Sequence, residues 1–325
     1  MRVGGYGAKR EDQSMSKKHS SLPYGRAICY SGYRNGQSPV TGAYPSYEQI
    51  KEDLLILEPN WDYLRLYDSS THAELVLKVI QDEKLSLRVL LGNDLAAELS
   101  NPNCPWEAQY SVTQLAENKA YNIRGLLRTI ELSNRFSDIV VAVSIGNEAS
   151  VDWTDHLVSV ESLIAYALIL REKIPQPITF CENYVPWWNK LAPLVEVIDF
   201  ISIHTYPVWE YQGLESAMDY TVSNYTSVAS KYPDKPVIIT EAGWATKSNG
   251  RGIEVNNASE EHQCEYLRQL VNWAENEQVL TFVFEAFDEP WKGSEHSDEP
   301  EKHWGIYYES RAEKPAVKTM LLAKG

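Results

Sequence analysis

Long apolar runs are missing from this sequence: none approaches the roughly 20 residues that a membrane-spanning helix needs, so a membrane protein is not expected. Basic residues are also scarce, because 30 Lys and Arg stand against 45 Asp and Glu, for a formal net charge of −15. Phosphate-rich partners are bound mainly through clustered Lys and Arg. Nucleic acid and anionic membrane are therefore not expected as partners, whereas a neutral ligand meets no such penalty.

Cysteine and histidine are too few and too scattered to indicate a metal site. The four cysteines, Cys29, Cys104, Cys181 and Cys264, form no CxxC pair. Two of them, Cys29 and Cys181, fall in apolar runs and are expected to be small buried residues, and a disulfide framework stays open although a chain of this size does not need one. The seven histidines show neither HxH nor HExxH spacing, so no metal and no other cofactor is expected. His204 ends an apolar run, where both ligation and hydrogen bonding are open to it.

The chain lacks a Gly/Ser/Pro-rich linker and an internal repeat, so 325 residues are interpreted as one large domain. Residues 1–24 are polar and rich in Gly, Ser and Lys, without the apolar core of an export signal. We predict a flexible N-terminal arm over 1–24 and a catalytic barrel over 25–325. A monomer is expected, and the localisation is unknown.

Eight short apolar runs, rich in Val, Ile and aromatic residues, alternate with longer segments of helical periodicity. Eight strands that are each followed by a helix predict an α/β fold of the single (β/α)8 TIM barrel type, with a doubly wound open sheet as the alternative. Ser46 with Gln49, and Asn257 with Glu260, resemble capping boxes that begin two of the helices. The predicted strands cover residues 26–32, 62–68, 85–93, 139–147, 177–183, 197–206, 236–243 and 280–288.

The predicted strands all end in side chains that can hydrogen-bond. In a TIM barrel the catalytic groups lie at this carboxyl end, on the loops that follow the strands. A barrel with a purely structural role would not need such a concentration of polar groups on one face. In strand order these residues are Tyr30 and Tyr33, Tyr67 and Asp68, Asn93 and Asp94, Asn147 and Glu148, Glu182 and Asn183, His204 and Tyr206, Glu241 and Trp244, Asp288 and Glu289.

Glu148 and Glu241 each terminate an otherwise apolar strand, in VAVSIGNEAS and PVIITEAG. A buried carboxylate without a partner is costly, so each needs a partner or a function. On the fourth and seventh strands of a barrel the two would face each other across the axis. Two carboxylates that flank one bond are the minimal machinery of glycoside hydrolysis. The alternative for either residue is a salt bridge at the barrel rim.

Arg65 is expected to point into the barrel. In DYLRLYD the strand alternation places Tyr63, Arg65 and Tyr67 on one face and the leucines on the other. An interior guanidinium must be paired, and a strand-end carboxylate is its natural partner. Pairing with Glu241 would keep that carboxylate ionised, as a nucleophile requires. Pairing with Asp68 or Asp94 alone, as a brace for the barrel, is the alternative.

The aromatic residues favour a sugar site. Tyr and Trp number 20 and 10 against only 6 Phe, an excess of rings with a polar handle. Such rings suit sugars, which offer apolar C–H faces and hydroxyl edges. Because most aromatic residues are core residues, only those at strand ends are candidates: Tyr33, Tyr206, Trp209, Trp244, Phe287 and Trp291.

Six motifs in barrel order together resemble glycoside hydrolase family 17, in its bacterial or fungal-like branch. They are YSGYRNGQSP, RLYD, GNEAS, YP, ITEAGWAT and FDEPWK, and they begin at residues 30, 65, 146, 206, 239 and 287. The resemblance implies a retaining (β/α)8 glycosidase that acts on β-1,3-glucan, either as an endohydrolase or as a glucanosyltransferase. The segment CENYVPWW does not align with the plant pattern, so the roles of Glu182, Trp187 and Trp188 stay open.

The resemblance implies that Glu148 is the general acid/base and Glu241 the nucleophile. Asn147 would hydrogen-bond the 2-hydroxyl of the sugar at the cleavage point. Glu148 would enter the reaction protonated, and the two carboxyl groups should lie ~5 Å apart, as in a retaining enzyme. The other predicted substrate-binding residues are Tyr30, Tyr33, Arg65, Tyr67, Asn93, Tyr206, Trp209, Trp244, Phe287, Glu289, Trp291 and Lys292.

The favoured function is endo-hydrolysis of laminarin-type β-1,3-glucan by double displacement. Transfer of the glycosyl group to a second sugar by the same two Glu residues is the first alternative. A catalytically silent glucan-binding barrel is a second, and a β-mannanase or xylanase of the same clan is a third.

Overall fold

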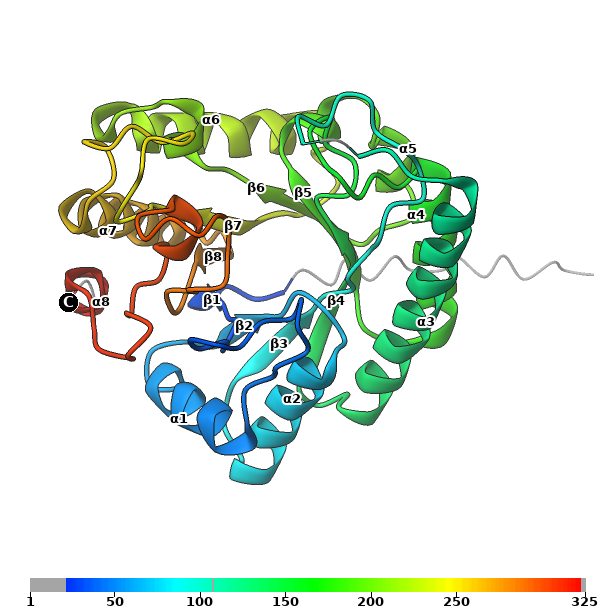
Figure 1. The fold of residues 1–325 in the computed structure, drawn as a ribbon, viewed down its shortest axis with the longest axis horizontal. Coiled ribbons are helices and arrows are strands. Elements are labelled where there is room, and N and C mark those ends of the chain that lie inside the picture. The colour runs from blue at the N-terminus through cyan, green and yellow to red at the C-terminus, as the bar shows by residue number, and fades with distance from the viewer. Residues whose placement is uncertain (1–21, 107, 323–325) are drawn as a thin grey trace, which may run out of the picture.

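The computed structural model describes residues 22–106 and 108–322, and within them eight parallel strands close a barrel in chain order (Figure 1). This confirms the (β/α)8 barrel and its eight predicted strands, which are shorter than expected, and it excludes the doubly wound sheet. The strands are β1 (Ala27–Cys29), β2 (Tyr63–Arg65), β3 (Arg88–Leu91), β4 (Val140–Asn147), β5 (Ile178–Asn183), β6 (Ile201–His204), β7 (Val237–Gly243) and β8 (Thr281–Phe284).

Helices surround the barrel and cover its outer face (Figure 1). The fifth connection differs from the simple pattern, because a short 3-10 helix and a single helical turn replace a long helix after β5. The α-helices are α1 (Tyr47–Leu57), α2 (Thr71–Glu83), α3 (Val112–Arg135), α4 (Val160–Lys173), α5 (Ala192–Val195), α6 (Leu214–Lys231), α7 (Glu260–Glu277) and α8 (Pro315–Leu322), and the 3-10 helices are η1 (Val185–Trp188), η2 (Pro207–Glu210) and η3 (Pro300–Lys302).

One of the two predicted capping boxes is present. The Ser46 side chain accepts from the backbone N–H of Gln49, whose own side chain accepts from the Ser46 N–H. The second prediction is wrong, because α7 begins after Ser259, whose hydroxyl accepts from the N–H of His262. Asn257 lies two residues too early to cap this helix, and its carbonyl accepts from the Trp244 indole instead.

The last described residues of the predicted arm contact the barrel. Leu22 packs against the core, and the Pro23 carbonyl accepts from the Tyr63 hydroxyl at 3.1 Å. Residues 1–21 of the predicted arm lie outside the described residues, so the boundary at residue 24 stays a prediction. Among the described cysteines Cys29 and Cys181 are buried in strands, as expected, and all four are free thiols.

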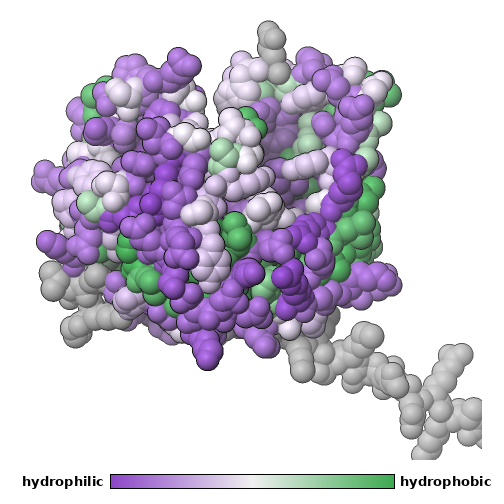
Figure 2. Space-filling view, turned by 60° about the horizontal axis from the view of Figure 1, so that its bottom comes forward, coloured by the Kyte–Doolittle hydropathy of each residue, from purple (hydrophilic) through white to green (hydrophobic). Residues whose placement is uncertain are grey.

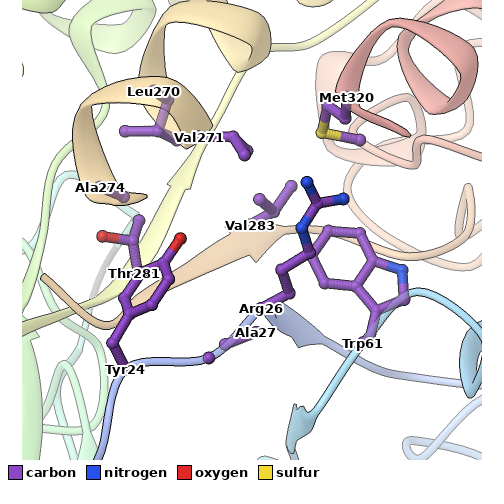
Figure 3. Close-up of a pocket in the computed structure, with 11 residues that line it drawn as sticks. Tyr24, Arg26, Ala27, Trp61, Leu270, Val271, Ala274, Thr281, Val283 and Met320 are labelled. Carbon is purple, nitrogen blue, oxygen red and sulfur yellow. The ribbon is translucent and has the colours of Figure 1, made fainter. Parts of the chain in front are cut away.

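A small cavity lies at the opposite end of the barrel from the strand-end residues, near the start of β1 and β8 (Figure 3). Its lining is mostly apolar, with Trp61, Leu270 and Met320 among the contributors. At about 20 Å³ it has room for a single water molecule and not for a ligand.

In the described part of the chain, no helix combines the length and the apolar character that crossing a membrane requires.

A buried carboxylate, Asp53 of α1, ties the first and last parts of the barrel together. It accepts from Arg311 Nε and Nη2 at 2.7 and 2.8 Å, from Arg34 at 3.0 Å and from the Tyr30 hydroxyl at 3.0 Å. Asp53 is fully buried and Arg311 nearly so. The two arginines and the tyrosine together satisfy a charge that would otherwise be costly.

Replacing Asp53 by Ala should lower the free energy of unfolding by about 3–5 kcal/mol, because Arg311 would keep a buried charge without its partner. Urea denaturation followed by circular dichroism measures the change. Glu52→Ala is the matched control, since Glu52 contacts Arg34 from an exposed position and should cost at most about 1 kcal/mol. Equal losses in the two variants would contradict the role assigned to Asp53.

Candidate active site

A cleft of about 980 Å³ crosses the face of the barrel on which the strands end. Figure 2 shows a hollow in the upper edge of the molecule, with many hydrophilic residues around its opening. Its size lies at the upper end of the roughly 300–1,000 Å³ that ligand sites span. Of the predicted site residues, the cleft is lined by Tyr30, Tyr33, Tyr67, Asn147, Glu148, Tyr206, Trp209, Glu241, Glu289, Trp291 and Lys292.

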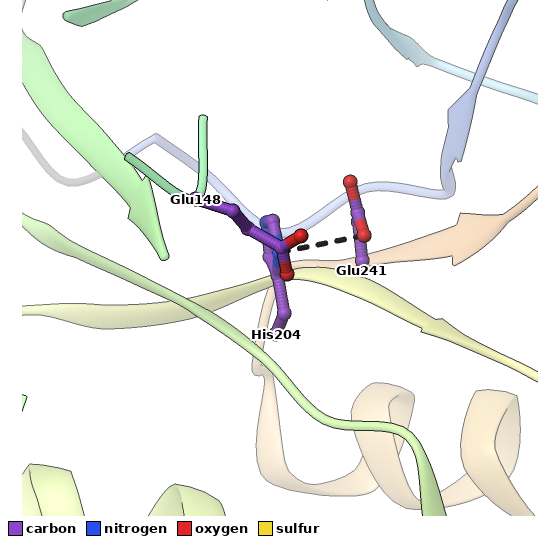
Figure 4. Close-up of side chains that lie close together, drawn as sticks. All are labelled: Glu148, His204 and Glu241. Carbon is purple, nitrogen blue, oxygen red and sulfur yellow. Dashed lines mark hydrogen bonds and ion pairs between the residues drawn. The ribbon is translucent and has the colours of Figure 1, made fainter. Parts of the chain in front are cut away.

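Glu148 and Glu241 meet at the floor of this cleft, where β4 and β7 end (Figure 4). A carboxylate oxygen of each lies within 4.8 Å of the other, with His204 of β6 between them. Glu148 directly follows β4 and has a backbone φ of 45°, in the left-handed region that non-glycine residues seldom occupy. The strand end therefore turns sharply and directs this side chain toward β7.

Glu241 is held as an anion by three donors. Arg65 Nη1 donates to its Oε1 at 2.5 Å, the Tyr67 hydroxyl donates to the same oxygen at 3.0 Å, and the Tyr206 hydroxyl donates to Oε2 at 2.5 Å. Burial alone would raise the pKa of Glu241, but the positive charges of His204 and Arg65 and the Tyr206 hydrogen bond outweigh it and lower the pKa to about 2.

Arg65 points into the barrel as predicted and pairs with Glu241 from the opposite wall. Its other nitrogen, Nη2, donates to Asn147 Oδ1. The alternative partners are engaged elsewhere, because Asp94 accepts from the Tyr121 hydroxyl and Asp68 from the Ser70 N–H. Arg65 thus links the ends of β2, β4 and β7, and it organises the site without lining the cleft itself.

His204 connects the two carboxylates. Its Nδ1 lies 2.9 Å from Glu148 Oε1 and 3.4 Å from Glu241 Oε2, and its side chain is fully buried (Figure 4). Burial alone would lower the pKa of His204, but the negative charge of Glu241 and the hydrogen bond with Glu148 contribute to raising it to about 10. At neutral pH, Nδ1 therefore carries a proton and donates a hydrogen bond to Glu148.

Glu148, His204 and Glu241 are also close enough to surround a metal ion. A histidine can ligate only through an unprotonated nitrogen. Because the Nδ1 of His204 carries a proton at neutral pH, the geometry fits a hydrogen bond to Glu148 better than a metal ion.

A second group of charges lies beside the cleft around Lys292. Its Nζ is 2.6 Å from Glu289 Oε1 and 3.0 Å from Glu285 Oε2. Glu289 also accepts from the Ser31 hydroxyl and the Trp291 indole, both at 2.6 Å. Burial and the charge of Glu289 raise the pKa of Glu285 well above its usual range, so this carboxyl keeps a proton beside its ionised neighbour.

A model of the BtgE/BtgC glycoside hydrolase domain matches residues 27–305, which is most of the chain. The chain belongs to this family. The match covers all eight strands and every lining residue just described, so the cleft lies within the BtgE/BtgC domain.

Curated and solved relatives agree with this BtgE/BtgC assignment. The chain is 26% identical, over 87% of its length, to a protein of Aspergillus niger named a putative glucan endo-1,3-beta-glucosidase, of which it covers 42%. It spans less than half the length of the curated relatives that it matches. A solved endo-laminarinase from Formosa Hel1_33_131 is 26% identical with a TM-score of 0.78, and the alignment covers 92% of this chain and 86% of that one.

A solved glycoside hydrolase family 17 β-1,3-glucanosyltransferase from Rhizomucor miehei is 22% identical with a TM-score of 0.66. That alignment covers 89% of this chain and 95% of the other. At this level of identity it supports the barrel fold alone.

Besides Arg65, three predicted binding residues of this BtgE/BtgC domain do not line the cleft. Asn93 is buried and donates to the Ile145 carbonyl at 3.1 Å, bracing the barrel wall. The Trp244 ring is buried against Tyr266, and Phe287 packs against Tyr30 and Tyr307. Each follows a strand end, but its side chain lies on the wrong side of the backbone to reach a ligand.

Tyr30 and Trp209 reach the cleft with part of their surface engaged elsewhere. The Tyr30 hydroxyl is committed to Asp53, so only its ring borders the cleft. Trp209 packs against Trp304 with ring centroids 5.9 Å apart. Both rings therefore shape the wall more than they offer hydrogen bonds.

Several lining residues were missed from the sequence. Trp106 and Trp153, on the loops after β3 and β4, are 56% and 41% exposed beside the cleft. Glu301 also lines it, and Glu285 supports Lys292 from behind. Glu285 could have been found as a carboxylate inside the apolar run LTFVFEAFD. Nothing in the sequence distinguishes the two loop tryptophans from other loop residues.

His204 should make the stability of the protein depend on alkaline pH. Because the folded pKa is near 10 and the unfolded value near 6.5, its contribution is complete below about pH 6.5 and is lost as the pH rises toward 10. The free energy of unfolding of the wild type, minus that of His204→Asn, should therefore fall across this window in urea titrations. His296→Asn, at an exposed loop position, is the control, and a difference that stays constant with pH would contradict the assignment.

Proposed function

We propose that this chain is a retaining glycoside hydrolase of family 17 that cleaves β-1,3-glucan within the chain, through a covalent glycosyl-enzyme. The observation that carries the proposal is the approach of the Glu148 and Glu241 oxygens to within 4.8 Å. Retaining glycosidases hold their carboxyl groups ≈ 5–5.5 Å apart, whereas inverting enzymes need ≈ 6.5–9.5 Å to admit a water molecule.

Glu241 is the nucleophile in this proposal. Its three donors and its low pKa keep it ionised at any working pH, so that it can attack the anomeric carbon. The bond from its oxygen to the sugar forms as the bond from the sugar to the leaving oxygen breaks. Arg65 and the two tyrosines remain in contact with the carboxylate and hold it in line for the attack.

Glu148 is the general acid/base. It delivers a proton to the leaving oxygen in the first step and removes one from an incoming water in the second, so that the configuration at the anomeric carbon is retained. His204 Nδ1 lies 2.9 Å from Glu148 Oε1 and orients this carboxyl group in the cleft. Asn147, fixed by Arg65, is placed to hydrogen-bond the 2-hydroxyl of the reacting sugar.

The substrate class rests on the relatives together with the cleft. The names of the Aspergillus niger and Formosa relatives both refer to cleavage of β-1,3-glucan. Tyrosine and tryptophan rings line the same cleft as the two carboxylates, and such rings suit the C–H faces of sugars. A neutral glucan also agrees with the net charge of −15. We expect the protein to act as a monomer.

Transfer to a second sugar is the main alternative, since the same two carboxylates serve both reactions. A silent glucan-binding barrel, a mannanase and a xylanase are further alternatives that share the strand-end carboxylates.

One experiment separates these functions. Laminari-oligosaccharides, mixed-linkage glucan, β-1,4-glucan, xylan and mannan are incubated with the protein, products are sized by chromatography, and the anomeric configuration is followed by ¹H NMR. Shorter β-1,3-linked products that first appear as the β-anomer support the proposal. Longer products indicate transfer, products from xylan or mannan alone indicate another specificity, and no product from any substrate indicates a binding protein.

Replacing the two carboxylates should have unequal effects. Glu241→Gln should lower kcat on laminarihexaose by about 10⁴-fold or more, because no nucleophile remains. Glu148→Ala should lower it by roughly 10²–10⁴-fold, because the sugar leaving group loses its proton donor. On a 2,4-dinitrophenyl β-laminaribioside, which leaves without a proton, added azide should restore turnover of this variant, because azide attacks the glycosyl-enzyme without a base and displaces Glu241 as a glycosyl azide forms. Glu295→Gln is the control for the removal of one negative charge, because Glu295 lies in an exposed loop, and its kcat should stay unchanged. A Glu241→Gln enzyme that keeps its activity would contradict the mechanism.

Trp106 should matter for long chains more than for short ones. It lines the cleft from the long β3–α3 loop with an exposed ring, so we expect it to contact sugar units beyond the one that reacts. Trp106→Ala should lower the kcat/KM for laminarihexaose relative to laminaritriose by about tenfold. Trp188→Ala is the matched control, because Trp188 is 46% exposed on a different surface and donates to Ser227. An unchanged ratio in Trp106→Ala would argue against cleavage within long chains.

A further inference from the structure

A histidine on the loop after Glu148 contacts the backbone that carries this residue. His156 Nε2 lies 3.0 Å from the Asn147 carbonyl oxygen, and its Nδ1 lies 2.7 Å from Asp155 Oδ1 and 3.1 Å from Thr154 Oγ1. None of the sequence motifs includes His156, and the mechanism above does not use it.

The contacts define the protonation state of His156. A carbonyl oxygen can only accept, so Nε2 must carry a proton, and the ionised Asp155 carboxylate requires a second proton on Nδ1. The ring is therefore a doubly protonated imidazolium. Burial alone would lower the pKa of His156, but the hydrogen bonds with Asp155 and the Asn147 carbonyl, together with the charges of Asp155 and Asp94, raise it.

The peptide group between Asn147 and Glu148 is held at both of its ends. His156 donates to its carbonyl oxygen, and its N–H, which belongs to Glu148, donates to the Cys181 carbonyl at 2.9 Å. The orientation of this peptide plane sets the φ of Glu148, which is 45°. A left-handed φ at a non-glycine residue persists only where its surroundings impose it. The two hydrogen bonds supply that constraint.

We propose that His156 is a positioning residue for the general acid/base: by holding the Asn147 carbonyl, it keeps Glu148 in the left-handed conformation that aims its carboxyl group at the leaving oxygen. The inference rests on the proposed function. His156 touches neither of the two carboxylates, so it acts through the backbone.

Other contacts hold the rest of this loop. Asn101 Nδ2 donates to the carbonyls of Asp152 and Thr154 at 2.9 and 2.7 Å, and the Tyr110 hydroxyl donates to the Asp155 carbonyl at 2.7 Å. The loop can therefore keep its course when the imidazole is removed. The effect of the removal should be confined to the peptide group that carries Glu148.

Leaving-group dependence tests the inference. A misplaced general acid slows departure of a poor leaving group, which needs a proton, and hardly affects a good one, which does not. His156→Ala should lower kcat/KM about 30-fold on phenyl β-laminaribioside and less than about threefold on the 2,4-dinitrophenyl analogue. His156→Gln, which can still donate to the carbonyl, should recover part of the loss on the phenyl substrate.

Asp152→Ala is the matched control on the same loop. It removes a contact of Asp152 with Lys190 at the surface and should change neither rate. Asp155→Asn provides a second variant that keeps the imidazole but weakens its charge, and it should show the same selective loss to a smaller degree.

Equal losses on the two aryl substrates, or no loss on either, would overturn the positioning role while leaving the proposed function intact. A wild-type protein that turns over neither aryl laminaribioside would overturn the proposed function, and this inference with it. A selective loss in His156→Ala that His156→Gln partly restores supports both.

Discussion

The buried ion pair between Arg65 and Glu241 is the interaction on which the site depends. A guanidinium inside a barrel costs several kcal/mol unless it is paired and fully hydrogen-bonded, and removing one partner of such a pair is more costly still. Arg65 satisfies this demand by contacting Glu241 on β7 and Asn147 on β4 at once. One side chain, Arg65, therefore sets both the charge of Glu241 and the position of the Asn147 amide beside Glu148. Loss of Arg65 would disturb both at once.

The two carboxylates differ because their surroundings differ. Glu241 is buried and accepts hydrogen bonds from three side chains. The Glu148 side chain is 19% exposed and is hydrogen-bonded to His204. Surroundings that differ in this way can assign the work of acid and of nucleophile to different carboxyl groups. On this view His204 and His156 act on Glu148 from opposite directions, the first at the carboxyl group and the second at the backbone.

The order and type of the elements, and the central groups of the site, could be predicted from the sequence, because strand alternation and strand-end polarity follow directly from barrel geometry. Arg65 was predicted to face inward from the alternation in DYLRLYD alone. Side-chain direction beyond the strand ends could not be predicted: Asn93, Trp244 and Phe287 follow strands but turn into the wall. The sequence also gives no signal for Trp106, Trp153 and His156, because they lie on loops without periodicity. Contacts between the loops after β3 and β4 position these loops, and such contacts cannot be predicted from neighbouring residues in the sequence.

The most direct test of the account is to trap the intermediate. A 2-deoxy-2-fluoro-β-laminaribiosyl fluoride reacts with the nucleophile of a retaining enzyme and releases the sugar slowly, so that mass spectrometry of peptic peptides can locate the attached group. The account predicts one sugar adduct per chain, on the peptide that contains Glu241, and none in a chain whose Glu241 has been replaced. An adduct on another residue, or turnover of β-1,3-glucan with inverted configuration and no adduct, would contradict it.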